Sequence, residues 1–288
     1  GSQPGLIPCD LYYAALDGDW DADHDNRFGE PEDSVDLYPD VYVGRFPATA
    51  ASSVDLLVDK FLRYTDDPED PYLRNVFLNG MDLYEWCIAE QAMEFYDSTL
   101  VPETMKPCVK VYDSHGGSHR DSMLHYLNRG QHIWVHSDHS NWSCLGAGWN
   151  NHRELLMRDD LADLTNGDDL SIMMTNGCSA GSYDSSDCVT EYFLLAPQGG
   201  GVAAFANSRT GLLSRSDPLH GMSFMQMEEL LRTFFSHPLH GELSDLTTVQ
   251  ARVAPLADTS ARYRWSQYQF TLFGEPCMPV WIPVSGGV

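Results

Sequence analysis

The sequence predicts an α/β protein built on a mainly parallel β-sheet with helices on both faces. Short apolar or β-branched runs recur along the chain, and helix-length segments separate most of them. One of these runs, SIMMT at 171–175, is largely apolar, which indicates a strand buried on both sides. Because parallel neighbours need long connections, the alternation favours right-handed strand–helix–strand crossovers.

The expected strands are runs of about five or six residues, a length typical of strands and too short for most helices. They lie at 11–16, 41–46, 75–80, 108–112, 132–137, 170–175 and 201–206.

Helical spacing is clearest after the second expected strand. Apolar residues recur there at i, i+3, i+4, i+7 and i+8, so we expect this side of the helix to pack on the sheet. These residues are Val54, Leu57, Val58, Phe61 and Leu62. Further helices are expected at 118–129, which ends at Gly130, and at 151–164, 187–196 and 221–236.

Composition limits the possible functions. The 288 residues carry 17 Lys and Arg against 42 Asp and Glu, a net charge of −25, so we expect no binding to nucleic acid. No apolar run approaches the roughly 18 residues of a membrane span, so we expect no membrane insertion. We divide the chain into an N-terminal subdomain at 1–68 and a larger subdomain at 69–288.

Two candidate catalytic residues directly follow expected strands. His139 lies just past 132–137, and Cys178 lies just past 170–175. In parallel sheets, ligands bind beyond the carboxyl ends of the strands. If these two strands are neighbours, the imidazole would favour a Cys178 thiolate and later protonate a leaving amine. Gly177 belongs to a turn whose backbone N–H groups would stabilise an oxyanion.

The same residues allow other interpretations. Cys178 could be a buried inert thiol beside an unrelated surface histidine. A metal cluster of His132, His136 and His139 is disfavoured because 132 and 136 share one face of a strand and 139 lies on the other. The histidines around the helix at 118–129 are expected at the surface rather than as ligands: His115, His119 and His125. The seven cysteines form no CxxC pair, which argues against a cysteine-type structural zinc site.

Longer motifs around the candidate residues resemble the gingipain-type cysteine peptidases, whose fold is caspase-like. HIWVHSDHSNW and SIMMTNGCSAGSYD are similar to the His and Cys motifs of that family. DLYPDVYVGRFPA, GGGVAAFANSRTG and FTLFGEPCMPVW agree in order, so the resemblance spans about residues 10–282. It implies a caspase-like three-layer sandwich with a mainly parallel sheet.

The resemblance also implies catalytic roles. His139 and Cys178 would be the dyad of a cysteine endopeptidase that hydrolyses peptide bonds through a thioester acyl-enzyme. Ser140 stands where the family usually has a glycine whose N–H binds the oxyanion. Asp138 also stands where glycine is usual, and its carboxylate would orient or charge the imidazole. The strand in GVAAFANSRTG would form a wall of the cleft. At its exit lie Asn207, Ser208 and Arg209.

An acidic loop at 17–30 reads DGDWDADHDNRFGE. Counted from Asp19, acidic residues fall at positions 1, 3, 5, 7 and 12, the ligand spacing of an EF-hand loop, with His24 in place of the usual glycine. A solvated charge run is the alternative, but clustered carboxylates favour a structural Ca²⁺, and similar acidic loops occur in gingipain-like proteins. The expected ligands are Asp19, Asp21, Asp23, Asp25 and Glu30, with Asp33, Asp36 and Asp40 as outer acidic residues.

The expected substrate is a polypeptide. The resemblance implies a basic residue before the cleaved bond, recognised by an acidic side chain, for which Asp82 and Glu85 are candidates. Arg209 would instead favour an acidic substrate residue. Two other functions stay open: a transpeptidase of the same fold, and a non-catalytic calcium-loaded interaction module. An extracellular or cell-surface location is expected because gingipain-like enzymes are usually exported.

Overall fold

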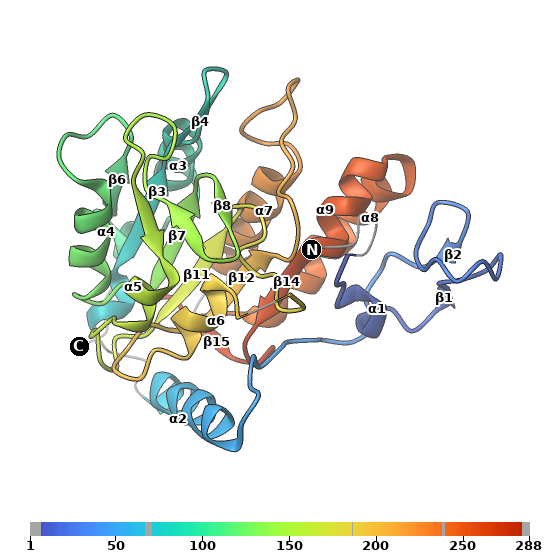
Figure 1. Cartoon of the computed structure of the whole chain (residues 1–288), viewed down its shortest axis with the longest axis horizontal. Coiled ribbons are helices and arrows are strands. Elements are labelled where there is room, and N and C mark those ends of the chain that lie inside the picture. The colour runs from blue at the N-terminus through green and yellow to red at the C-terminus, as the bar shows by residue number, and fades with distance from the viewer. Residues whose placement is uncertain (1–6, 67–70, 186, 238–239, 284–288) are drawn as a thin grey trace.

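A six-stranded sheet lies at the centre of the protein (Figure 1). The computed structural model describes residues 7–66, 71–185, 187–237 and 240–283. Neighbouring strands are parallel, except that the edge strand β14 is antiparallel to β12. The strand order is β14 (Phe270–Phe273), β12 (Gly201–Asn207), β11 (Ser171–Thr175), β7 (Ile133–Ser137), β3 (Val76–Gly80) and β6 (Val109–Tyr112). The predicted mainly parallel α/β fold is confirmed.

Both faces of this sheet are buried, because successive side chains of each strand point to opposite sides. Phe77, Trp134 and Met173 belong to one apolar core, which α4 (His119–Leu127), α5 (Arg158–Ala162) and α6 (Val189–Leu194) cover. Leu78, Val135 and Met174 belong to the other core, beneath α3 (Ala89–Thr99), α7 (Ser223–Ser236) and α8 (Leu246–Thr259). The result is a three-layer sandwich.

The other elements are short strands and peripheral helices. The remaining helices are α1 (Leu11–Ala14), α2 (Ala51–Asp66) and α9 (Ala261–Gln269). The remaining strands are β1 (Gly18–Asp19), β2 (Ser34–Val35), β4 (Asp82–Tyr84), β5 (Cys87–Ile88), β8 (Ser140–Asn141), β9 (Cys144–Gly146), β10 (Leu155–Met157), β13 (His240–Glu242) and β15 (Pro279–Trp281). Among the described residues, no helix combines the length and hydrophobicity that a bilayer crossing requires.

Five of the seven predicted strands are confirmed, as β3, β6, β7, β11 and β12. The strand predicted at 11–16 is wrong, because this segment forms α1 and buries Leu11 and Ala14, three residues apart on one side of a helical turn. The strand predicted at 41–46 is also wrong: it makes only an isolated bridge, between Arg45 and Phe273.

The predicted helices at 118–129, 187–196 and 221–236 correspond to α4, α6 and α7. The helix predicted at 151–164 is wrong in its first half, where β10 pairs with β9 before α5 begins. Residues of this segment are needed to complete the small sheet β10–β9–β8, so strand pairing prevails over helical spacing there.

The predicted helix after residue 50 exists as α2, but the predicted packing face is wrong. Val54, Val58 and Leu62 are exposed at 42%, 38% and 56%. The buried side carries Leu57, Lys60 and Tyr64 instead.

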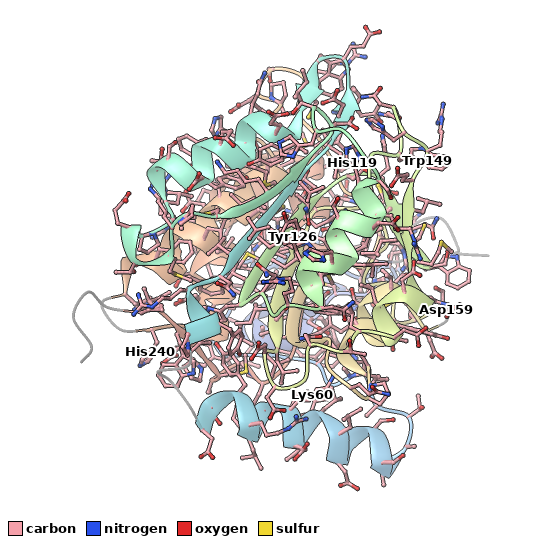
Figure 2. All side chains as sticks on the ribbon, turned by 90° about the vertical axis from the view of Figure 1, so that its left-hand side faces the viewer. Lys60, His119, Tyr126, Trp149, Asp159 and His240 are labelled. Carbon is pink, nitrogen blue, oxygen red and sulfur yellow. The ribbon has the colours of Figure 1, made fainter. Side chains whose placement is uncertain are left out.

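Polar contacts determine this orientation of α2. Lys60 lies on the side of the helix that faces the rest of the molecule (Figure 2). Its Nζ donates to the carbonyl oxygens of Leu194 at 2.6 Å and Gly201 at 3.4 Å, and burial lowers its pKa to about 7. The Tyr64 hydroxyl bonds Nε2 of His132 at 2.9 Å. The spacing of apolar residues alone could not reveal these hydrogen bonds, so it predicted the wrong buried face.

The N-terminal segment packs on the C-terminal helices. Leu11, Ala14 and Leu37 share a small apolar cluster with Ala254 of α8 and Tyr268 of α9. Figure 1 shows this segment beside α8 and α9, away from the central strands. The predicted subdomain boundary between residues 68 and 69 lies outside the described residues, and the division stays a prediction.

Candidate active site

The strands that precede His139 and Cys178 are adjacent and parallel, as predicted. β7 and β11 pair from Ile133 opposite Ile172 to His136 opposite Thr175, an offset of 39 positions. The same offset separates His139 from Cys178. The two residues therefore leave neighbouring strands at the same level, and both line one cavity of about 480 Å³.

The His139 ring is held by the chain segment that follows β3. Its Nε2 lies 3.1 Å from the carbonyl oxygen of Leu83, and the ring of Tyr84 meets it edge-on at 5.5 Å between centroids. A carbonyl oxygen only accepts, so Nε2 carries the proton and Nδ1 carries the lone pair. Asn150 donates to the same Leu83 oxygen at 2.6 Å.

Cys178 is a half-buried thiol in the resting structure. Burial raises its pKa, so the neutral form is favoured before substrate binds. Its Sγ lies 3.9 Å from the carbonyl oxygen of Gly211. Asn207 holds the turn that carries Cys178. Its Nδ2 donates to the carbonyl oxygens of Asn176 at 2.9 Å and Gly177 at 3.2 Å.

Ser140 connects the two loops that bear the candidate catalytic residues. Its Oγ donates to the carbonyl oxygen of Cys178 at 2.8 Å. A Cβ atom at position 177 would lie 2.1 Å from this Oγ, so the serine needs the glycine opposite it. The resemblance leads us to expect glycine at position 140. This chain has a serine there, and its side chain hydrogen-bonds the backbone of Cys178.

Asp138 positions the backbone of His139 rather than its ring. Oδ1 accepts from the His139 N–H at 2.6 Å, and Oδ2 accepts from the N–H groups of Gly148 at 2.9 Å and Trp149 at 3.0 Å. Burial raises the pKa of this carboxyl to about 6 despite these bonds. Asp138 therefore joins the His139 turn to the loop at 148–152.

The other two histidines of β7 and its approach are core residues. His132 bonds Tyr64 and the carbonyl oxygen of Leu73, both at 2.9 Å. His136 bonds Thr175 and the carbonyl oxygen of Gly146, also at 2.9 Å. Burial lowers the pKa of each ring to about 4, so both are neutral. With both ring nitrogens of each residue engaged, they form no metal cluster with His139.

The residues predicted at the cleft exit lie behind or beside the cavity. Ser208 is buried, and its Oγ donates to the carbonyl oxygen of Pro8 at 2.9 Å. Arg209 forms a bidentate ion pair with Asp184, at 2.8 and 2.7 Å. None of the three residues Asn207, Ser208 and Arg209 is among those that line the cavity.

The predicted acidic specificity residues also lie outside the lining. Asp82 accepts from Nδ2 of Asn151 at 3.0 Å, and burial raises its pKa. Glu85 is exposed. The structure brings neither carboxylate into the wall of the described cavity.

Sequence reasoning missed most of the cavity wall. Apolar and aromatic side chains come from β4 and the segment after it and from residues 212–213, and Arg215 and Arg262 supply positive charge. The Arg215 guanidinium lies 5.3 Å from the ring of Trp86. No local pattern could have grouped these residues in one wall, because they come from four separate parts of the chain. The missed lining residues are Leu83, Tyr84, Trp86, Asn176, Thr210, Gly211, Leu212, Leu213, Arg215 and Arg262.

The acidic loop brings three carboxylates together, two from the EF-hand spacing and one from outside it. Asp21 and Asp23 converge with Asp33, with one oxygen of each within 4.8 Å of the others. Glu30 pairs with Arg27 at 3.0 Å. Buried Asp33 accepts backbone N–H groups from Ala22, Gly29 and Glu30 at 2.8 to 2.9 Å. The oxygens of Asp19 and Asp25 accept from the N–H groups two residues later.

Comparison with known proteins identifies the family. The sequence matches the model of Peptidase family C25 over residues 3–281. The chain belongs to this peptidase family. The structure resembles the crystal structure of the Arg-specific cysteine proteinase gingipain R, with a TM-score of 0.74 and 17% identity over 97% of this chain and 60% of that one. It also resembles a complex of the Porphyromonas gingivalis RgpB pro- and mature domains, with a TM-score of 0.72 and 16% identity over 96% of this chain and 62% of that one.

These findings confirm the gingipain-type resemblance and its fold, and the family is one of cysteine-type peptidases. The chain spans about three fifths of the length of the gingipain chains it matches. A search of curated proteins found no match.

We expect Gly146→Ala to disrupt the site, because its Cβ would lie 2.2 Å from Oδ2 of Asp138 and 2.6 Å from the carbonyl oxygen of His139. Overpacking of this kind costs roughly 1–3 kcal/mol of folding free energy. Urea unfolding measures the loss. The control is Gly116→Ala, where a Cβ meets no atom within 4 Å. Equal stability of the two variants would contradict the described packing around Asp138.

Proposed function

We propose that the protein is a cysteine endopeptidase in which His139 and Cys178 are the catalytic dyad. One observation carries this proposal: both groups line the same cavity, at the carboxyl ends of adjacent parallel strands. Membership of Peptidase family C25 supports the reaction class. A buried neutral thiol alone would be inert, so the proposal depends on the imidazole beside it.

In the proposed reaction, Cys178 transfers its proton to Nδ1 of His139 as Sγ attacks the scissile carbonyl carbon. A sulfur–carbon bond forms, and the imidazolium then protonates the departing amine as the peptide bond breaks. Water hydrolyses the resulting thioester, which releases the new carboxyl end and restores the thiol. The Leu83 carbonyl keeps the proton on Nε2 and stabilises the imidazolium that forms.

The backbone N–H of Cys178 is the oxyanion donor that we propose. Within its turn, the N–H groups of Gly177, Ser179 and Gly181 already donate to Thr175, Arg209 and Asn207. The hydrogen bond from Ser140 to the Cys178 carbonyl orients this peptide segment. A donor fixed before the reaction begins stabilises developing charge without reorganisation.

Cys178→Ala and His139→Ala should each lower kcat/KM for peptide hydrolysis by at least about 1,000-fold. Initial rates on a mixed peptide library measure the loss. Cys277→Ala is the matched control, because that thiol is exposed and is not part of the cavity lining. His139→Ala should also slow iodoacetamide labelling of Cys178, because the imidazole no longer accepts the thiol proton. Full hydrolysis by Cys178→Ala would refute the dyad, and inactivity of the unaltered protein on all peptides would favour an interaction module.

Local charge favours an acidic residue before the cleaved bond. Arg215 and Arg262 line the cavity, and both oxygens of the lining residue Asp138 already accept backbone N–H groups. The net charge of −25 attracts cations in general, but salt screens it beyond roughly 8–10 Å. The proposed preference therefore differs from that of the structural relative, which is an Arg-specific proteinase.

Arg215→Gln should reduce the preference for Asp and Glu over Gln before the cleaved bond by about fivefold, the effect of one exposed charge pair. Library cleavage analysed by mass spectrometry gives this ratio. The control is Arg209→Gln, which alters an arginine paired with Asp184 outside the lining. Loss of the preference in the control alone would assign acidic recognition to Arg209, and preference for Arg or Lys in the unaltered protein would refute an Arg215 pocket.

We also propose that the acidic loop binds a structural Ca²⁺. The convergence of Asp21, Asp23 and Asp33 supports this, because three carboxylates at such distances repel one another unless a cation lies between them. An exposed calcium-stabilised loop suits a calcium-rich exterior, which supports an extracellular or cell-surface location.

A chelator should lower the melting temperature, and added Ca²⁺ should restore it by binding the folded state. Asp23→Asn should weaken this response. Asp25→Asn separates the two ligand sets, because it belongs to the EF-hand spacing but not to the convergent group. A response unchanged in Asp25→Asn supports the convergent set, whereas no response in the unaltered protein refutes a calcium site.

A further inference from the structure

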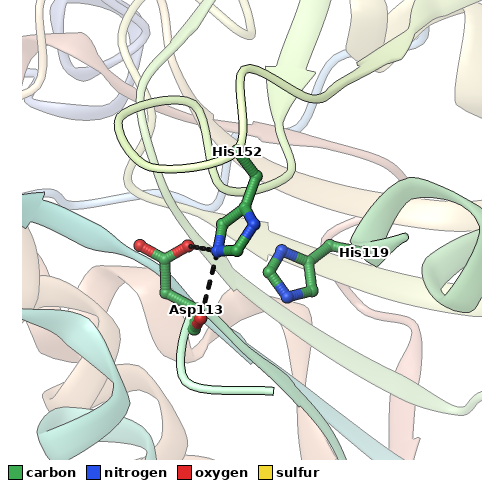
Figure 3. Close-up of side chains that lie close together, drawn as sticks. All are labelled: Asp113, His119 and His152. Atoms are coloured by element: carbon green, nitrogen blue, oxygen red, sulfur yellow. Dashed lines mark hydrogen bonds and ion pairs between the residues drawn. The ribbon is translucent and has the colours of Figure 1, made fainter. Parts of the chain in front are cut away.

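We propose that Asp113, His119 and His152 form a binding site for a divalent transition metal, with zinc as the preferred ion. Asp113 directly follows β6, His119 begins α4, and His152 lies in the loop between β9 and β10. Figure 3 shows the three side chains turned toward one another. One potential ligand atom of each lies within 4.8 Å of the other two.

His119 already has the arrangement of a metal-ligating histidine. The residue is 1% exposed, contrary to the expectation of a surface position. Nε2 donates to the carbonyl oxygen of His115 at 2.9 Å, which leaves the lone pair on Nδ1. Nδ1 is buried and has no hydrogen-bond partner. A histidine that binds a metal typically donates its other ring N–H to such a carbonyl.

Asp113 offers a second buried acceptor at the same place. Its Oδ2 accepts from Nδ2 of Asn151 at 2.6 Å and from the N–H of Asp82 at 3.1 Å. Oδ1 is buried without a hydrogen bond. Nε2 of His152 lies 3.1 Å from Oδ1. The hydrogen bond of this nitrogen, however, is with the backbone carbonyl oxygen of Asp113, at 3.2 Å.

Two buried acceptor atoms that lack a hydrogen bond are costly, and a cation between them removes that cost. Gly148 leaves space at this point: a Cβ there would lie 2.8 Å from Nδ1 of His119 and 2.9 Å from Oδ1 of Asp113. His152 completes the set in the tautomer that carries its proton on Nδ1, because Nε2 then offers its lone pair. Metal binding is therefore expected to weaken at acidic pH.

The donor set selects the ion. Two imidazoles and one carboxylate suit zinc, which binds such ligands at roughly 2.0–2.2 Å and leaves a fourth position for water. Calcium prefers oxygen ligands alone, as in the acidic loop.

The site is linked to the catalytic histidine through the loop at 148–152. At one end of this loop, the Gly148 and Trp149 N–H groups bind Asp138. In its middle, Asn150 donates to the Leu83 oxygen that also accepts from His139. A metal on His152 would hold this loop in place, and this consequence rests on the proposed function.

The test uses metal-free Cys178→Ala protein, so that zinc cannot bind the candidate nucleophile. Calorimetry with Zn²⁺ should give one site that His119→Ala weakens by at least about 100-fold. His152→Ala, at a more exposed position, should also weaken it and guards against misfolding of the first variant. His125→Ala is the matched control, an exposed histidine on the same helix.

Co²⁺ identifies the ligands, since the six cysteines that remain in Cys178→Ala are free thiols that could compete. The proposal expects visible d–d absorption of a four-coordinate ion without thiolate charge transfer. Absence of binding would overturn the proposal, as would a thiolate spectrum. So would a zinc affinity in His119→Ala or His152→Ala equal to that of the Cys178→Ala parent protein. Zinc binding by a protein whose unaltered form cleaves no peptide would keep this site and refute only the proposed peptidase activity.

Discussion

The parallel pairing of β7 with β11 is the constraint on which the candidate site depends. Their register sets His139 and Cys178 at the same level although 39 positions separate them along the chain. Strands lie about 4.8 Å apart, so a slip of one residue would turn one side chain toward the opposite face. The register is secured because both faces of both strands are buried, with Trp134 and Met173 on one side and Val135 and Met174 on the other.

Beyond the strand ends, hydrogen bonds of buried polar side chains, rather than strand pairing, hold the loops of the site in place. Asp138 joins the His139 turn to the loop at 148–152, and Ser140 joins the same turn to the Cys178 carbonyl. Glycines at 146 and 177 make room for these side chains. Loops without regular secondary structure are otherwise mobile, whereas a catalytic pair needs positions fixed within fractions of an ångström.

Burial sets the protonation state of several groups at both ends of the central strands. It keeps the rings of His132 and His136 neutral and favours the thiol form of Cys178. The same effect leaves lone pairs of His119 and Asp113 without donors. Buried groups with satisfied hydrogen bonds support the fold, whereas those with unsatisfied lone pairs indicate where a ligand would be accommodated.

Local patterns and ordered motifs were enough to predict the alternating strands and helices, the adjacency of the strands before His139 and Cys178, and the resemblance to gingipain-type peptidases. The buried face of α2 could be found only from the folded chain, since the partners of Lys60 and Tyr64 lie over 65 positions away. The tertiary structure likewise decided that Asp33 joins Asp21 and Asp23, and that Arg215 and Arg262 line the cavity. Such groupings come from contacts between distant segments, which no local periodicity encodes.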